Sequence, residues 1–360
     1  MGDWYHTYAS LLVASYLNPT SKWVPNESGV EALADNLILN GKNIYNCSIN
    51  STTFPPNHDR QPAPICKPEK GSRYVTKVSW GKSYRLRLIN HSTFFSFWFS
   101  IDNHNIEIVE IDGVEITPIP FRGVNVNIGQ RYSIIVRTIE KVGNYYMRAT
   151  FPTSCFLPFV PYSSLGLNST HFQVMGILSY GNTPPTAPPI GVAGNTSNPS
   201  GAADNPYNYI AWEGCNDMDF DRPKPRRKLP AYDLKPGLNM HYIEFAFRQA
   251  QNVNRIFINQ SSWAPLENNA TLWKTIGQKF PASGGGTGYS SWEYGLNQRV
   301  LLLGDEGANK GAQLVINSLD GMEHPWHLHG HEFQVCLCFI LVGYTLIFGF
   351  RGKDCRLGEG

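Results

Sequence analysis

Charged side chains are scarce in this sequence of 360 residues. They make up 16% of it, whereas soluble domains usually carry about 25%. The formal net charge is only +2 at pH 7, and the one short basic run, residues 222–228, is typical of a solvated loop. Because no basic stripe is present to attract a phosphate backbone, we expect no nucleic-acid partner.

Other signals are missing as well. The sequence has neither the glycine fingerprint of dinucleotide-binding folds nor a phosphate-binding loop. Its first residues lack the positive start and the apolar run of a signal peptide. The uncharged apolar run at residues 336–350 is shorter than the roughly 20 residues that span a bilayer. We therefore expect no membrane insertion, and a hydrophobic anchor at 336–350 is the weaker alternative.

Aromatic residues, glycine and proline are abundant instead. Aromatics reach 13% of the chain, which also has 33 glycines and 25 prolines, the profile of a protein rich in strands and turns. Sequons for N-glycosylation are frequent, which favours a secreted glycoprotein. Their asparagines are Asn26, Asn46, Asn50, Asn90, Asn168, Asn195, Asn259 and Asn269.

Apolar and polar residues alternate with period two between residues 74 and 180, as they do in half-buried strands. Asn-Gly at 40–41 and Asp-Gly at 112–113 supply tight turns. This spacing predicts an all-β fold built on a Greek-key β-sandwich. The strands that the pattern predicts are 85–89, 106–111, 123–128, 132–137, 144–148 and 172–178.

The alternation stops after residue 180. Residues 181–237 are rich in small residues and proline, which predicts a linker. Alternation returns at 238–335 and ends again in the apolar tail 336–360, where we expect no sandwich strand. The elements predicted in the second region are strands at 239–247, 299–303 and 312–317 and a short helix at 272–276.

A cluster of histidines is the strongest chemical signal. Four of the ten histidines lie in His324-Pro-Trp-His327-Leu-His329-Gly-His331, and neutral imidazole is the commonest metal ligand. On a strand, His327 and His329 share a face, whereas His324 faces the other way. One segment is thus expected to serve two metal sites. Zinc hydrolases and cupin oxygenases also use such pairs, but a zincin would need a histidine where Val335 stands.

This octet resembles the signature of the multicopper oxidases, in particular of fungal laccase-like enzymes. The resemblance implies that His324 ligates the type 1 copper, His327 the type 2 copper and His329 one of the type 3 pair, while His331 is no ligand. It also implies tandem cupredoxin-like sandwiches: a near-complete middle domain at 1–180 and a truncated third domain at 238–335. The complete enzymes of the family hold four copper ions, oxidise phenolic or other aromatic molecules and reduce O2 to water.

The resemblance suggests further features. In phenol-oxidising relatives an acidic residue contacts the phenol from the loop that follows the 85–89 strand. Here that loop carries Phe94 and Phe95 and no carboxylate, which would suit a bulkier aromatic substrate. The cysteines allow a separate prediction. In an oxidising compartment two disulfides are expected, with the connectivity open. The candidate pairs are Cys47 with Cys66 and Cys155 with Cys215.

The resemblance also has gaps. The His-Cys-His motif that supplies the type 1 thiolate is absent, and so are the His-x-His pairs of a first domain. We therefore expect this chain alone to be inactive, as an incomplete copy of a secreted, monomeric laccase-like oxidoreductase. The alternative is a non-catalytic secreted cupredoxin-type protein that binds copper weakly or not at all. Translated intron sequence would explain the abrupt change after Val335, and the true start would lie upstream.

Overall fold

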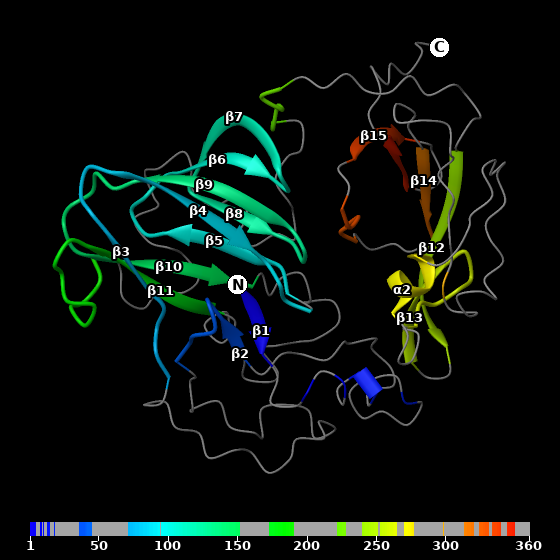
Figure 1. The fold of residues 1–360 in the computed structure, drawn as a ribbon, viewed down its shortest axis with the longest axis horizontal. Coiled ribbons are helices and arrows are strands. Elements are labelled where there is room, and N and C mark those ends of the chain that lie inside the picture. The colour runs from blue at the N-terminus through cyan, green and yellow to red at the C-terminus, as the bar shows by residue number, and fades with distance from the viewer. Residues whose placement is uncertain are drawn as a thin grey trace. The chain divides into compact units, whose positions relative to one another are not determined.

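The computed structural model describes residues 1–4, 36–44, 71–93, 95–151, 173–190, 222–227, 240–250, 253–264, 270–276, 313–319, 324–330, 333–339 and 344–349, with a few single positions such as 298. The chain divides into two compact units, Met1–Arg227 and Lys228–Gly360 (Figure 1). Each unit is described by itself. In the described part of the chain, no helix combines the length and the apolar composition that crossing a bilayer requires.

The first unit is a sandwich of two sheets (Figure 1). One sheet has the order β3 (Val75–Val78), β11 (Gln173–Tyr180), β10 (Asn144–Thr150), β5 (Phe97–Ile101) and β8 (Gly123–Val126). The other has the order β4 (Ser83–Ile89), β9 (Arg131–Arg137), β6 (Ile106–Ile111) and β7 (Val114–Phe121). A small antiparallel pair, β1 (Gly2–Trp4) and β2 (Asn36–Ile38), accompanies them. All these pairings are antiparallel except that of β11 with β3. The predicted all-β sandwich is confirmed.

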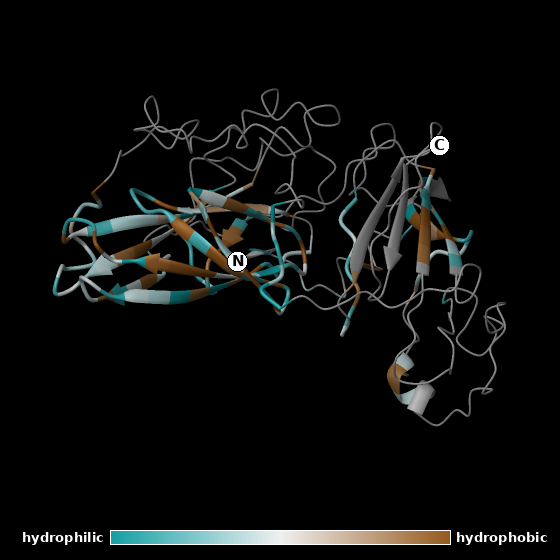
Figure 2. Ribbon diagram, turned by 90° about the horizontal axis from the view of Figure 1, so that it is seen from above, coloured by the Kyte–Doolittle hydropathy of each residue, from teal (hydrophilic) through white to brown (hydrophobic). Residues whose placement is uncertain are grey.

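The core of the first unit follows from the alternation along its strands. Phe97, Phe99 and Ile101 of β5 belong to the same buried cluster as Ile106 and Ile108 of β6, from the facing sheet. Because successive side chains of a strand point to opposite faces, the odd positions of β5 enter this core together. Figure 2 shows the resulting hydrophobic bands along the strands.

The turns form where the sequence predicts them. Asn40 and Gly41 have φ of 47° and 73°, and Asp112 and Gly113 have φ of 49° and 97°. A turn with two successive positive φ values matches the twist of the strands it joins. Asparagine, aspartate and glycine are the residues that adopt this conformation at least cost, which is why these dipeptides were informative.

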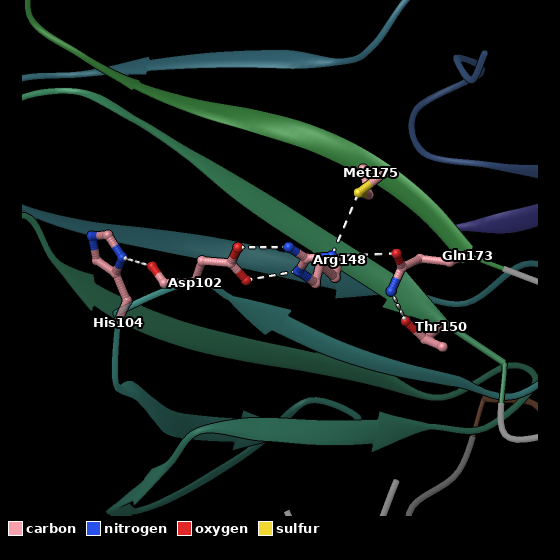
Figure 3. A network of polar contacts seen from close by, with 6 residues as sticks. All are labelled: Asp102, His104, Arg148, Thr150, Gln173 and Met175. Carbon is pink, nitrogen blue, oxygen red and sulfur yellow. Dashed lines mark hydrogen bonds and ion pairs between the residues drawn. The ribbon is translucent and has the colours of Figure 1, made fainter. Parts of the chain in front are cut away.

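A buried polar network lies on the face of the five-stranded sheet that is turned away from the hydrophobic core (Figure 3). The guanidinium of Arg148 on β10 donates to both carboxylate oxygens of Asp102, at 2.7 and 2.8 Å. The two side chains are only 8% and 9% exposed. Arg148 also donates to Gln173, whose amide in turn donates to Thr150. Several strands are thereby held in register by side chains as well as by the backbone.

Residues 181–237 were predicted to form a linker. The structure describes two parts of this range, 181–190 and 222–227, and neither is a loose connection. The amide of Asn144 donates to the carbonyls of Pro184 and Ala187, and Ile190 packs against the core of the first unit. Farther along, Pro225 forms a bridge with Ile116 at the edge of β7. Both segments therefore belong to the first unit, because backbone and amide contacts hold them where composition alone suggested a loose connection.

The second unit contains one described sheet, in the order β13 (Val253–Ile258), β12 (Met240–Ala250), β14 (Gln313–Ser318), β16 (Tyr344–Gly349) and β15 (Gln334–Phe339). The predicted helix is confirmed as α2 (Thr271–Ile276). The strand predicted at 299–303 lies outside the described residues. The buried cluster of this unit, as far as it is described, consists of Ile243, Phe245 and Ile316.

The prediction that residues 336–350 form no strand is wrong. β15 and β16 lie largely within that run and pair with each other in antiparallel register. β16 also pairs with β14, so the hairpin extends the sheet of the second unit. A continuous apolar run is compatible with a strand covered on both faces, and the absence of alternation therefore did not exclude one.

Candidate metal centre

The histidine octet follows β14 and precedes β15. Residues 324–328 run outside any strand, and His329 and Gly330 form a turn in which Gly330 has a φ of 73°. The expectation that the histidines lie on a regular strand is therefore wrong, since no ladder pairing includes them. His331 lies outside the described residues.

The side chains of the octet differ in exposure along the segment. His324, Trp326 and Leu328 are half-buried, whereas His327 and His329 are exposed. The rings of His327 and His329 lie 4.8 Å apart between centroids, with an interplanar angle of 80°. These two imidazoles therefore lie next to each other, and the side chain of His324 has a different environment.

Aromatic side chains of β12 surround His324. Its ring centroid is 4.7 Å from that of Phe245 and 6.3 Å from that of Phe247. Trp326 meets Phe245 edge to face, with centroids 5.3 Å apart. The Nε2 atom of His324 has almost no contact with solvent. An imidazole packed in this way keeps one orientation, as a metal ligand must.

The donor set suits copper in kind, because imidazole is a good copper ligand. The number of described ligands, however, is too small for a complete copper site. Within the residues that the structure describes, no three metal-ligating side chains gather at one point. The exposed pair His327 and His329 would supply two ligands on one side of the segment, and His324 would supply a third on the other side. The arrangement thus fits the edges of two copper sites and encloses neither.

The two phenylalanines predicted to form a substrate loop have different outcomes. Phe94 lies outside the described residues. Phe95 is completely buried, and its ring packs edge to face on Phe151 at 4.3 Å between centroids. The prediction that Phe95 lines a substrate pocket is therefore wrong. A phenylalanine that follows a strand can belong either to an exposed loop or to the core. Here Phe95 belongs to the core of the sandwich.

The sequon at Asn90 has an unfavourable environment for a glycan. The residue is only 1% exposed, and its Nδ2 atom donates to the carbonyls of Phe95 and Val126 at 2.7 and 2.8 Å. A glycan is attached through that same nitrogen, so this geometry argues against Asn90 as an acceptor in the folded chain. Asn259 is half-buried at the end of β13. The other six sequons and the four cysteines predicted to pair lie outside the described residues.

His104 is buried in the first unit, between β5 and β6. Its Nδ1 donates to the Asp102 carbonyl at 2.7 Å, so Nε2 accepts from the Tyr180 hydroxyl at 2.6 Å. Burial lowers the pKa of this imidazole from its usual value and raises that of Tyr180. His104 thus acts as a neutral hydrogen-bonding group within the sandwich.

Two residues that orient the candidate site were not singled out in the sequence as site residues. Phe245 and Phe247 were predicted only as members of an apolar strand face. Their role depends on the octet returning to β12 from far along the chain, which a local pattern does not contain. The signal that was present is the alternation of large apolar residues along β12.

Comparison with known proteins agrees with this description. Two family models described as multicopper oxidase match residues 1–169 and 291–337, and the second match includes the octet. Oxidoreductase OpS5 of Beauveria bassiana is 28% identical over 336 residues, which are 89% of this chain and 46% of that protein. Laccase-1 of Botryotinia fuckeliana is 28% identical over 266 residues, 73% of this chain and 39% of that protein.

Among solved structures, the laccase of Botrytis aclada superposes with a TM-score of 0.61 at 21% identity, over 97% of this chain and 57% of that one. At this level of identity the likeness shows the fold alone. The chain spans less than half the length of the two curated relatives named above. The two family matches together cover more than half of the chain, and the chain belongs to the multicopper oxidases, a family whose cofactor is copper and which includes the fungal laccases that it resembles.

Proposed function

We propose that this chain is part of a copper oxidoreductase of the laccase type. The reaction would be the one-electron oxidation of phenolic or other aromatic molecules, coupled to the reduction of O2 to water. The observation that carries this proposal is the two-sided octet. His327 and His329 lie side by side and exposed, and the half-buried ring of His324 packs on Phe245. A segment that serves two different copper sites would need this division.

The resemblance to the family suggests the roles of the three histidines. His324 would ligate the type 1 copper, where electrons enter from the substrate. His327 would ligate the type 2 copper, and His329 one of the type 3 pair. Copper bound there would supply one-electron redox chemistry. The contribution of the chain would be orientation, because Phe245 and Phe247 pack against the His324 ring.

Several properties of the whole protein belong to the same proposal. We infer that it is secreted, monomeric and glycosylated at sequons other than Asn90. We also infer that Cys47 pairs with Cys66, and Cys155 with Cys215. Peptide mapping without reduction tests the pairing: linked peptides are expected, and free thiols at Cys47 and Cys66 would exclude that bridge.

A second candidate function is a non-catalytic secreted protein that binds copper. The observation that favours it is the partial donor set of the described residues together with the absence of any His-Cys-His motif from the sequence. After loading with copper, the 360-residue chain should lack an intense blue absorption band and should consume no O2 with phenols. A blue band with near-stoichiometric type 1 copper would contradict this ligand count.

A fused version of the protein would distinguish the two candidate functions. In it, a domain with His-x-His pairs precedes the chain, and a segment with His-Cys-His follows residue 335. For an oxidase, His324→Ala abolishes the blue band, whereas His327→Ala or His329→Ala keeps the band and stops O2 uptake. A folded, copper-loaded fusion that is colourless and consumes no O2 would favour the non-catalytic function. Loss of the band in His329→Ala, with His324→Ala still blue, would reverse the ligand assignment.

A further inference from the structure

The basic run at 222–228 is not used by the proposed copper chemistry. Of the 30 lysines and arginines in the chain, only Arg226, Arg227 and Lys228 are adjacent to one another. Lys224 stands two positions before Arg226, which gives the order Lys-Pro-Arg-Arg-Lys. A sequence with few charges thus has one short segment in which basic residues are adjacent.

The structure places this segment at the surface beside the edge of β7, with a bridge at Pro225 and bends at Arg226 and Arg227. The backbone N–H of Thr117 donates to the Lys224 carbonyl at 2.9 Å, and that of Arg226 donates to the Glu115 carbonyl at 2.8 Å. These two bonds pair the segment with the edge of β7. The side chains of Lys224, Arg226 and Arg227 are all exposed. Three positive charges thus project from a short stretch that, among the described residues, two backbone hydrogen bonds hold in place.

One further contact precedes the segment. The guanidinium of Arg222 lies over the ring of Phe121, 4.7 Å from its centroid. This contact ties the start of the run to the first unit and leaves the exposed positions 224–227 beyond it. Short pairings of this kind open locally far more often than a strand in the middle of a sheet.

The segment ends at the boundary of the two compact units, which lies between Arg227 and Lys228. Each described sheet is built from strands of one unit only. A cut after Arg227 would leave the paired residues 224–226 attached to the first unit. It would therefore divide the chain without removing a described strand from either sheet.

We propose that Lys224–Arg227 is a processing site for a serine endoprotease that recognises paired basic residues. Proteases bind their substrates as extended strands, with alternate pockets for the side chains. Acidic pockets would select the charges of Lys224, Arg226 and Arg227 by charge complementarity. Water would add across the Arg227–Lys228 peptide bond, leaving a carboxylate on Arg227 and an amino group on Lys228. The reaction needs no oxidant, no copper and no second substrate.

The test uses the folded 360-residue chain and a purified endoprotease of the subtilisin class that is specific for dibasic sequences. Intact-mass measurement and N-terminal sequencing should identify two products first, residues 1–227 and 228–360. Arg227→Gln and Arg226→Gln should each slow this cut about tenfold or more, because each leaves an acidic pocket of the protease without its partner. Arg222→Gln removes the same charge outside the recognised positions and should not slow the cut.

Three results would overturn the proposal. The first is a folded chain that stays intact at a protease concentration that cleaves a free Lys-Pro-Arg-Arg peptide. The second is an initial cut elsewhere in the chain. The third is an unchanged rate in both Arg226→Gln and Arg227→Gln. None of these results depends on copper binding, so the proposal fails or stands separately from the oxidase function.

Discussion

The two units differ in how completely their described sheets are covered. In the first unit two sheets face each other, and Phe99 and Ile108 from opposite sheets belong to one continuous core. In the second, one sheet is described, and large side chains such as Tyr242 and Trp273 are 70% and 71% exposed. The second unit nevertheless carries all three candidate copper ligands. Among the described residues, most of the packing thus lies in one unit and the candidate copper ligands lie in the other.

The largest expected effect tests whether this difference in packing is a difference in stability. Phe99→Ala removes a ring that is only 2% exposed and should lower the free energy of unfolding of the first unit by about 3–5 kcal/mol. Urea unfolding should have two transitions, with the second unit unfolding first because its described core is smaller. Fluorescence and circular dichroism, followed together, measure both.

Phe245→Ala is the matched variant in the second unit, where the ring is 4% exposed. It should shift only the first transition, and Phe99→Ala only the second. A single transition that moves equally in both variants would mean that the two units unfold as one body, which breaks the comparison.

The next effect concerns the buried ion pair of the first unit. Asp102→Asn leaves the Arg148 guanidinium without a charged partner and should lower the free energy of unfolding by about 3 kcal/mol. Glu107→Gln is its control, because Glu107 pairs with the largely exposed Arg137 at 3.2 Å and should cost about 1 kcal/mol or less. Equal losses in the two variants, measured by urea unfolding, would contradict a buried role for Asp102.

A smaller effect depends on pH. Burial lowers the pKa of His104, so the unfolded chain binds a proton near its usual pKa of about 6.5 that the folded chain does not bind. The free energy of unfolding should therefore be unaffected by this group at higher pH and should fall as the pH drops below about 6.5. The slope is at most about 1.4 kcal/mol per pH unit. His104→Gln should flatten it, and an unchanged slope would mean that His104 is not the group responsible.

The smallest effect tests the exposed aromatic residues of the second unit. Trp273→Gln on α2 should change the free energy of unfolding by less than about 0.5 kcal/mol, since its ring is mostly in water. Thermal and urea unfolding measure this directly. A loss of more than about 2 kcal/mol would mean that the ring is covered in solution, and the second unit would then be better packed than its described residues indicate.

Six strands of the first unit's sandwich could be predicted from their alternation, whereas β3, β5 and β7 were not. β5 reads Phe-Trp-Phe-Ser-Ile, and all five residues are buried. Its outward face is thus covered as well, and no polar residue marks it reliably. β7 contains Pro118 and Pro120, which argue against a strand unless it lies at a sheet edge. Edge position and double coverage are properties of the whole fold, and a local pattern does not contain them.

The candidate site divides in the same way. The different environments of His324 and of the pair His327 and His329 could be expected from their spacing, whereas their roles as copper ligands stay a prediction. The packing of His324 on Phe245 could not be expected, since it joins residues nearly eighty positions apart. The burial of Phe95 and Asn90 was missed for a related reason. In the sequence both residues stand beside polar residues that are typical of a loop. Their burial depends on the closed sandwich, which a local pattern does not contain.

The most direct test of the central claim is a Cu(II) titration of the intact 360-residue chain, followed by electron paramagnetic resonance. The claim is that His327 and His329 act together on one side of the segment and that His324 acts on the other. His327→Ala and His329→Ala should each weaken copper binding about tenfold or more, with loss of a nitrogen ligand from the spectrum, whereas His324→Ala should leave both nearly unchanged. Equal loss in His324→Ala, or no loss in the other two, would contradict the division of the octet between two copper sites.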